Sequence, residues 1–257
     1  MSHWTQKFFV KRPELWKHFL DRGWKRSTVT IRGIMKILKQ HGISKGKLLE
    51  IGCGNGRICI PIAQRGFQVT GVDIGSMYIK DAKERAHMRK VKANFVCGDA
   101  RKLKQLVRGK YDIALSVWTS IGYYSKRIDE RLFKSVAQLL KKKGLFLILN
   151  TMSQEHLLNH YCSSMFNETD RYMVLHQNNR FDRYHSVNTE TWVFYEKNGR
   201  DLEYVDELEL RLRIYSLAEI VEMAESAGME FVEAYDNLRD LSSARPDSVI
   251  NVVLQKK

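Results

Sequence analysis

The chain has 257 residues, of which 44% are hydrophobic, so it is long enough for one globular domain with a sizeable core. No apolar run approaches the roughly 20 residues of a membrane-spanning helix, and the N-terminus lacks the apolar core of a secretion signal. The four cysteines, at positions 53, 59, 97 and 162, form no C-x-x-C pair. We therefore expect a cytoplasmic protein with reduced thiols and no metal site.

The formal net charge of +14 is concentrated near the N-terminus. Residues 1–47 contain twelve Lys and Arg residues against only Glu14 and Asp21, so most of the excess charge lies there. Such a segment suits nucleic acid, an anionic lipid surface or an acidic substrate. It is equally consistent with a solvated helix face, and the charge alone does not decide between these interpretations.

The N-terminal segment is expected to form two helices. Apolar residues recur at helical spacing over residues 4–22 and again over residues 28–41. Trp24 falls between the two helices, which makes it a candidate for a lid residue. We assign residues 1–46 to a basic helical cap.

Strand and helix patterns alternate from residue 47 onward. Strands are expected at 47–52, 67–73, 93–98, 111–118 and 144–151, and helices at 57–65, 77–90 and 127–142. This alternation predicts a parallel sheet with helices on both faces, whose ligands bind at the carboxyl ends of the strands. The expected fold class is therefore a doubly wound, mainly parallel α/β structure.

Glycines occupy alternate positions where the first strand turns into a helix, at Gly52, Gly54 and Gly56. Without a Cβ, these residues let the backbone bend tightly and lie against a ligand. The dinucleotide motif G-x-G-x-x-G would need a glycine where Arg57 stands. The carboxylate of Glu50 would oppose a pyrophosphate but suit a cationic amine, which favours S-adenosylmethionine over NAD.

Acidic residues also end the next two strands, at Asp73 and Asp99. An acid at the tip of the second strand can accept hydrogen bonds from two ribose hydroxyls. Asp99 is placed to accept a hydrogen bond from the amino group of adenine. Because Glu50 and Ser116 map to the same edge of the sheet, we expect one shared cleft.

These motifs resemble those of class I S-adenosylmethionine-dependent methyltransferases, in particular the small-molecule branch. The resemblance extends from about Gly46 to the C-terminus, and its motifs stand at 69–75, 98–101, 115–124, 213–220 and 227–229. It implies a Rossmann-like seven-stranded sheet, with S-adenosylmethionine as cofactor and S-adenosylhomocysteine as product. The cofactor-binding residues that follow from the motifs are Glu50, Gly52, Cys53, Gly54, Asn55, Arg57, Asp73, Ile74, Tyr78, Asp99, Ala100, Arg101 and Ser116.

The remaining segments are expected to complete this architecture. Asn198-Gly199 is a strong two-residue hairpin turn between strands at 189–195 and 201–215. We therefore expect a core at 47–151, an antiparallel insertion at 152–215 that looks like the family's substrate lid, and a C-terminal completion of the sheet at 216–257.

Methyl transfer from a sulfonium is an in-line displacement, for which the protein mainly orients the reactants and excludes water. The candidate catalytic residues are Tyr123, His185 and Tyr215, with His156 and His176 as further possible bases. The candidate substrate contacts are Trp24, Trp118, Tyr124 and Arg213.

The expected reaction is transfer of a methyl group to nitrogen or oxygen of a small-molecule acceptor. The fourth strand lacks the Asn/Asp-Pro-Pro-aromatic motif of base-modifying amine methyltransferases, and no cysteine nucleophile stands near the fourth or fifth strand. One alternative is an RNA or tRNA methyltransferase that binds through the basic N-terminal helices. Another is a non-catalytic subunit that binds S-adenosylmethionine. The sequence leaves the acceptor and the oligomeric state undetermined.

Overall fold

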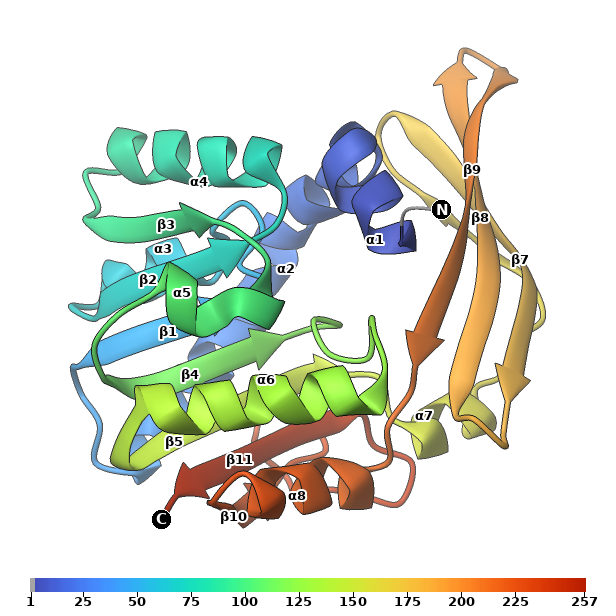
Figure 1. Ribbon diagram of the computed structural model, residues 1–257. Helices are drawn as coiled ribbons and strands as arrows, with labels where there is room; N and C mark the ends of the chain where they lie inside the picture. The colour runs from blue at the N-terminus through green and yellow to red at the C-terminus, as the bar shows by residue number, and fades with distance from the viewer. Residues whose placement is uncertain (1–2) are drawn as a thin grey trace.

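The computed structural model describes residues 3–257 and contains two sheets joined by N-terminal helices (Figure 1). The larger sheet has seven strands in the order β10-β11-β5-β4-β1-β2-β3. Its strands are β1 (Lys47–Ile51), β2 (Gln68–Asp73), β3 (Ala93–Cys97), β4 (Tyr111–Val117), β5 (Leu140–Thr151), β10 (Met229–Ala234) and β11 (Ile250–Lys256). The first five strands are parallel, whereas β11 runs antiparallel between β5 and β10. The predicted fold class is confirmed.

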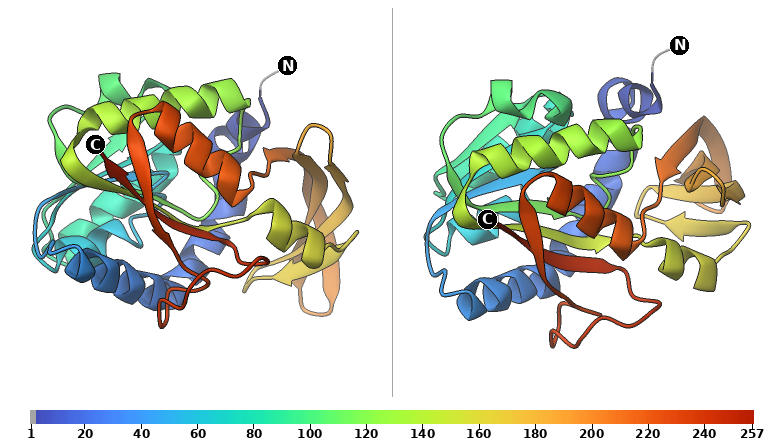
Figure 2. Two further views of the ribbon diagram at one scale, coloured as in Figure 1. Left: turned by 90° about the horizontal axis from the view of Figure 1, so that it is seen from below. Right: turned by 60° about the horizontal axis from the view of Figure 1, so that its bottom comes forward.

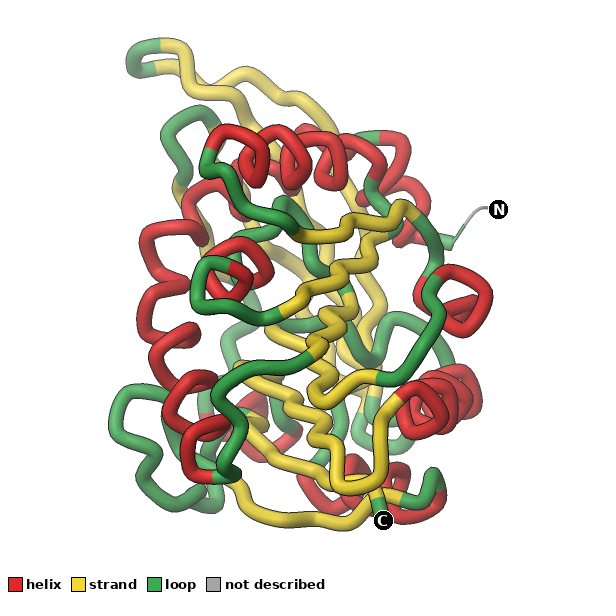
Figure 3. The backbone as a smooth tube through the Cα atoms, turned by 90° about the vertical axis from the view of Figure 1, so that its left-hand side faces the viewer, coloured by secondary structure: helices red, strands yellow, loops and turns green. Residues whose placement is uncertain are grey.

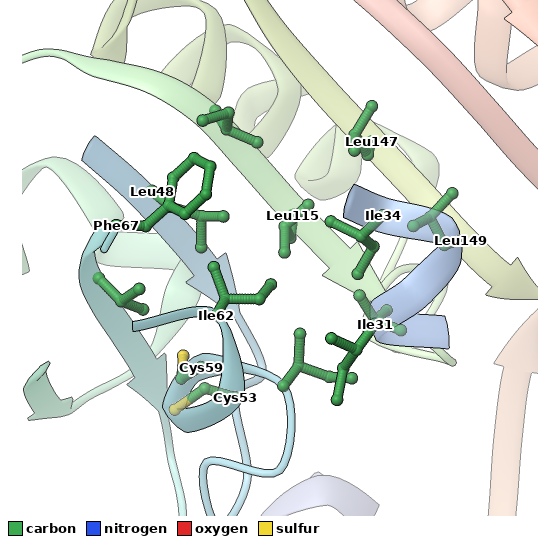
Figure 4. Packing of buried hydrophobic residues seen from close by; sticks show 14 of the residues in the cluster. Ile31, Ile34, Leu48, Cys53, Cys59, Ile62, Phe67, Leu115, Leu147 and Leu149 are labelled. Carbon is green, nitrogen blue, oxygen red and sulfur yellow. The ribbon is translucent and has the colours of Figure 1, made fainter. Parts of the chain in front are cut away.

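Helices cover both faces of this sheet (Figure 3). One face packs against α2 (Pro13–Gln40), α3 (Cys59–Ala63) and α4 (Ser76–Met88). The other packs against α5 (Leu103–Leu106), α6 (Lys126–Leu139) and α8 (Leu217–Ser226). Because side chains of a strand alternate between faces, Leu147 joins the first layer and its neighbour Phe146 the second. Figure 4 shows Ile31 and Ile34 of α2 in the first layer with Leu147.

The smaller sheet is antiparallel and lies to one side of the larger one (Figure 2). It consists of β6 (Met165–Glu168), β7 (Tyr172–Asp182), β8 (Val187–Asn198) and β9 (Asp201–Arg213), and α7 (Gln154–Asn159) precedes it. We call β6–β9 the lid sheet. The β8–β9 hairpin across Asn198-Gly199 was predicted, but β6 and β7 were missed because β7 buries a histidine at a position where an apolar residue would signal a strand.

The N-terminal prediction was wrong about where the helix breaks. A short α1 (Trp4–Gln6) continues into a π-helical turn (Lys7–Lys11), and then α2 runs unbroken for 28 residues. The break falls at Arg12, because Pro13 has no N–H to donate and favours the first helical position. Trp24 therefore lies within α2 and not between two helices.

The long helix α2 connects the two sheets. Its first half packs with the π-helical turn against the lid sheet, in a cluster that includes Phe8, Leu15, Phe194 and Leu208. Its second half packs on the central sheet. This arrangement holds the lid sheet over the carboxyl edge of β1 to β4. None of the helices in residues 3–257 combines the length and apolar character needed to cross a membrane.

Part of the basic charge of the N-terminal segment is neutralised within the chain. Lys7 and Arg12 form ion pairs with Asp206 of β9. Lys17 pairs with Asp21 and Asp81. These cations therefore connect α2 to the lid sheet and to α4.

Close packing of α2 on the C-terminal segment generates a stability prediction. A Cβ added to Gly33 would lie 2.6 Å from both the Cβ and the carbonyl oxygen of Leu238. We expect Gly33→Ala to lower the free energy of unfolding by about 1–3 kcal/mol. The energetic cost of this overlap exceeds what alanine gains over glycine in helix propensity, about 1 kcal/mol. Urea denaturation measures the change.

Thr28→Ala is the matched control, because Thr28 is exposed on the same helix. It gains helix propensity without a clash, so it should leave stability unchanged or slightly raised. If Gly33→Ala stabilised the protein as much as the control, the close approach of α2 to Leu238 would be contradicted.

Candidate active site

A cavity of about 460 Å³ lies at the carboxyl edge of the central sheet, a volume suited to a small organic ligand. Its floor is formed by the segments that follow β1, β2, β3 and β4. Its roof comes from α1, the π-helical turn, α2 and the lid sheet. The lining residues that the argument uses are Phe9, Trp16, Phe19, Gly52, Gly54, Arg57, Asp73, Ile74, Tyr78, Asp99, Ala100, Arg101, Trp118, Tyr123, Tyr124, Asn167, His176 and Trp192.

The glycine turn after β1 depends on glycine for its conformation. Gly52, Gly54 and Gly56 have φ of 72°, 52° and 79°, a region that disfavours side chains. The N–H groups of Gly52 and Cys53 donate to the carbonyl of Val72 at 2.8 and 3.0 Å. The turn is therefore fixed against the end of β2, with its open side toward the cavity.

Asp73 connects this turn to the segment after β2. One carboxylate oxygen accepts the N–H of Gly54 and the other accepts the N–H of Gly75, each at 2.8 Å. Burial raises the pKa of Asp73, while these backbone hydrogen bonds act to lower it. Asp73 lines the cavity, where its remaining lone pairs can accept hydroxyl donors.

Asp99 lies in the same cavity, at the end of β3. Its carboxylate accepts hydrogen bonds from the backbone N–H and the guanidinium of Arg101. Burial would raise the pKa of Asp99, but these hydrogen bonds outweigh it and lower the pKa. The Arg101 guanidinium also lies 4.2 Å from the ring centre of Tyr124, so the two form one wall of the cavity.

Arg57 is a partly buried cation without a carboxylate contact. Its guanidinium stacks on Trp118 at 3.7 Å, and no hydrogen bond or ion pair to it is formed within residues 3–257. Burial lowers the pKa of Arg57 to about 10, although the charge of Glu50 acts to raise it. A guanidinium that lines a cavity without an acceptor is suited to an anionic ligand group.

Glu50 does not line the cavity, contrary to the sequence-based expectation. It is 3% exposed and accepts a hydrogen bond from the Cys59 thiol at 2.8 Å. Burial raises the pKa of Glu50 to about 7, against the hydrogen bond from Cys59 and the charge of Arg57. Glu50 is the penultimate residue of β1, and its side chain lies beneath the glycine turn, next to Cys59 of α3.

Three other predicted cofactor residues also lie behind the cavity wall. Cys53 is buried beside Cys59, and the amide of Asn55 donates to Asp21 at 3.0 Å. Ser116 is fully buried within β4, and its hydroxyl has no partner among the described residues. The predicted cofactor residues that do line the cavity are Gly52, Gly54, Arg57, Asp73, Ile74, Tyr78, Asp99, Ala100 and Arg101.

Two of the three predicted catalytic residues lie elsewhere. His185 occupies the β7–β8 connection, where its side chain is 68% exposed and contacts Asp182 at 2.6 Å. Tyr215 is buried outside the cavity, where its hydroxyl donates to Asp129 at 2.7 Å. Tyr123 does line the cavity, but burial raises its pKa, so it remains a protonated phenol that can orient a ligand.

Two of the four predicted substrate contacts are also displaced. Trp24 packs against Arg85 and Arg89 of α4, because α2 continues through it. Arg213 pairs with Glu219 at 3.1 Å and donates to the carbonyl of His185. It thereby fixes the end of β9 to the start of α8. Trp118 and Tyr124 remain in the cavity wall.

The lid sheet contributes His176, which was named as a possible base, and two cavity residues that no predicted site included. Asn167, His176 and Trp192 line the cavity, and the rings of His176 and Trp192 lie 4.2 Å apart. The alternation of Tyr172, Val174 and His176 is the signal that could have placed them, because every second residue of a strand shares a face.

Comparisons with known proteins support the assignment of the core. Residues 48–144 match the family described as a methyltransferase domain. A protein of Geobacillus sp. (strain WCH70), named as a methyltransferase, is 26% identical over 161 residues, 61% of this chain and 59% of that protein. A ubiquinone biosynthesis O-methyltransferase of Pelagibacter ubique is 33% identical over 102 residues, 40% of each chain. The matched segments thus span between two fifths and three fifths of these relatives.

Solved structures agree over most of the chain. An S-adenosylmethionine-dependent methyltransferase from Clostridium acetobutylicum superposes with a TM-score of 0.75 at 15% identity, covering 88% of this chain and 90% of that one. An amino pentose methyltransferase from Micromonospora echinaspora, solved with S-adenosylmethionine bound, gives 0.70 at 15% identity and covers 97% and 98%.

The cleft at the strand ends and these matches define the class of protein. Residues 48–144 match the methyltransferase domain family, and the chain as a whole has the fold of the class I methyltransferases on which it superposes. S-adenosylmethionine is the cofactor of this class, as the sequence motifs implied.

The buried pair of Tyr215 and Asp129 generates a prediction that separates structure from catalysis. We expect Tyr215→Phe to lower the free energy of unfolding by about 1–3 kcal/mol, because the buried Asp129 carboxyl loses a hydrogen-bond donor. Affinity for S-adenosylhomocysteine, measured by calorimetry, should change by less than about twofold. Tyr123→Phe is the matched control for stability, since its hydroxyl forms no hydrogen bond within residues 3–257. A large loss of affinity in Tyr215→Phe with unchanged stability would restore Tyr215 to the binding site.

The raised pKa of Glu50 predicts a pH-dependent stability. Its folded pKa of about 7 exceeds the ordinary value of 4.5, so its contribution is fully present below pH 4.5 and is lost as the pH rises through 7. Relative to Glu50→Gln, the wild-type protein should therefore lose on the order of 1–3 kcal/mol of unfolding free energy between pH 5 and pH 8. Urea denaturation at both pH values measures this. Parallel pH dependence in the two proteins would show that Glu50 is not buried as described.

Proposed function

We propose that this chain is an S-adenosylmethionine-dependent methyltransferase that moves a methyl group to nitrogen or oxygen of a small-molecule acceptor. The observation that carries the proposal is a single cavity with two chemically different ends. Asp73, Asp99 and Arg57 lie on the side of the central sheet, whereas His176 and Trp192 lie on the side of the lid sheet. Such a cavity can hold a polar cofactor and a less polar acceptor side by side.

The polar end fits the groups of the cofactor. Asp73 has free lone pairs that can accept hydrogen bonds from the ribose hydroxyls. Asp99 lines the same cavity, where it can accept a hydrogen bond from the amino group of adenine. The unpaired guanidinium of Arg57 suits the carboxylate of the methionine part. Bound there, the cofactor supplies a methyl group on a sulfonium, which is already activated toward a nucleophile.

The task of the chain is then to position the acceptor and to exclude water. Phe9, Trp16 and Phe19 from the N-terminal helices close the cavity together with Trp192 of the lid sheet. Trp16 and Phe19 stack at 5.1 Å, and Trp192 lies 5.8 Å from Trp16. These rings form an apolar wall against which the body of an acceptor can pack.

The size of the cavity, about 460 Å³, favours a small acceptor over RNA. An RNA-binding methyltransferase needs an open basic surface leading to the site. Here Lys7, Arg12 and Lys17 are engaged by Asp206, Asp21 and neighbouring carboxylates. The names of the relatives point the same way, since one is a ubiquinone biosynthesis O-methyltransferase and one structural neighbour is an amino pentose methyltransferase.

Calorimetry with S-adenosylmethionine, with NAD as comparison, tests the cofactor, and transfer of a labelled methyl group tests the reaction. We expect Asp73→Asn to weaken S-adenosylmethionine about 10–100-fold, because hydrogen bonds to a charged group contribute roughly 1.5–3 kcal/mol. Asp112→Asn is the matched control, since Asp112 also accepts a backbone N–H, that of Lys47 at 2.8 Å, but at the opposite edge of the sheet.

The control should lose stability without losing affinity for the cofactor. The proposal fails if the wild-type protein does not bind S-adenosylmethionine. It is also contradicted if Asp112→Asn and Asp73→Asn weaken binding equally.

A further inference from the structure

One face of the lid sheet carries a histidine that is oriented like a general base. His176 of β7 lies directly opposite Trp192 of β8, so their side chains share a face. Glu190 is two residues before Trp192, and Asn167 lies two positions along β6 from the residue opposite His176. Asn167, His176, Glu190 and Trp192 therefore all point to the face of the lid sheet that looks toward α2 and the cavity.

The hydrogen bonds of His176 determine which ring nitrogen is free of a proton. Its Nδ1 lies 3.4 Å from a carboxylate oxygen of Glu190, which accepts, so Nδ1 carries the hydrogen. Its Nε2 lies 3.0 Å from the amide nitrogen of Asn167, which donates. The single lone pair of Nε2 accepts this hydrogen bond, so an acceptor can donate its proton there only by replacing the Asn167 amide, and both His176 and Asn167 line the cavity.

The other ionisable groups of the cavity wall are less suited to accept a proton. Asp73 is bound by two backbone N–H groups, and Asp99 is paired with Arg101. Asp129 accepts from Tyr215 and from the backbone of Gly122. Burial raises the pKa of Tyr123 and Tyr78, so both stay protonated. Among these lining groups, His176 is the one on the lid-sheet side of the cavity, where its ring lies 4.2 Å from that of Trp192.

We propose that His176 accepts the proton of the acceptor during methyl transfer and that Glu190 positions its ring. This inference rests on the proposed function. It names the acceptor class as a hydroxyl or amine that still carries its proton when it binds. The acceptor's body would pack on Trp192 and the aromatic side chains of the N-terminal helices.

The step balances without a further reactant. The acceptor oxygen or nitrogen forms a bond to the methyl carbon, and the carbon–sulfur bond breaks with its electron pair going to sulfur. The acceptor proton passes to Nε2 of His176, which becomes an imidazolium. The positive charge thus leaves the sulfur and appears on His176, where the carboxylate of Glu190 stabilises it.

The first test needs only the cofactor and its product. S-adenosylmethionine carries a sulfonium charge that S-adenosylhomocysteine lacks. If His176 faces the methyl group, the sulfonium charge should disfavour the imidazolium. The pH midpoint of the His176 imidazole resonance, measured by NMR, should therefore be lower with S-adenosylmethionine than with S-adenosylhomocysteine. We expect a difference of about half a pH unit or more, because a unit charge within roughly 8 Å has an effect of this size.

His185 is the internal control, since it also contacts a carboxylate but lies exposed outside the cavity. Its midpoint should be the same with both ligands, and His176→Gln identifies the His176 resonance by its disappearance. Equal midpoints for His176 in the two complexes would overturn the inference. Failure of either ligand to bind in calorimetry would instead contradict the proposed function, on which the inference depends.

The second test measures transfer of labelled methyl to a catechol and to an amino sugar. For the acceptor that the wild-type protein methylates, His176→Gln should lower kcat about 10²–10⁴-fold, while His185→Gln leaves it unchanged. The affinity for S-adenosylmethionine should stay within about twofold. Glu190→Gln should lower kcat less and shift the pH profile, which loss of packing alone would not do. Wild-type kcat and pH profile in His176→Gln would refute the role of this histidine.

Discussion

The hydrogen bonds from Gly54 and Gly75 to the Asp73 carboxylate are the constraint on which the candidate site depends. They join the turn after β1 to the segment after β2, and they fix an acid at the floor of the cavity. Glycine adopts the positive φ values of this turn without steric cost, and the N–H groups of the turn are bound by Asp73 and Val72. The rest of the fold serves to place a roof over this floor. The long helix α2 does so by packing on the central sheet at one end and on the lid sheet at the other.

The division of labour between the two sheets gives the cavity its chemistry. The parallel sheet contributes polar groups from strand ends, where side chains and backbone N–H groups of neighbouring strands converge. The lid sheet contributes a flat face on which His176 and Trp192 lie side by side. A methyl donor and its acceptor need these different surroundings, because one carries charge and the other must lose a proton. The partly buried guanidinium of Arg57 lies on the polar side and explains how a charged ligand could be held there.

The central sheet could be predicted from the sequence because strand and helix periodicities alternate clearly and its cofactor motifs are local. The acids Asp73 and Asp99 were placed correctly for the same reason, since each ends its strand. The remaining errors concern residues whose position depends on distant parts of the chain. Glu50 faces the core because of the register of β1, and Tyr215 is directed by Asp129, 86 positions away. The apolar periodicity indicated two helices with Trp24 between them, but packing on both sheets keeps α2 continuous. His176 was named as a possible base, but its strand was missed because a buried polar residue hides the alternation.

The most direct measurement compares the affinities of S-adenosylhomocysteine and 5′-methylthioadenosine, which lacks the amino acid part, for the wild-type protein and Arg57→Met. If adenosine binds at Asp73 and the carboxylate at Arg57, the wild-type protein should prefer S-adenosylhomocysteine by about 10–100-fold. That preference should largely disappear in Arg57→Met, while the affinity for 5′-methylthioadenosine stays the same. An undiminished preference in Arg57→Met would show that this guanidinium does not hold the ligand, and it would contradict the account of the polar end of the cavity.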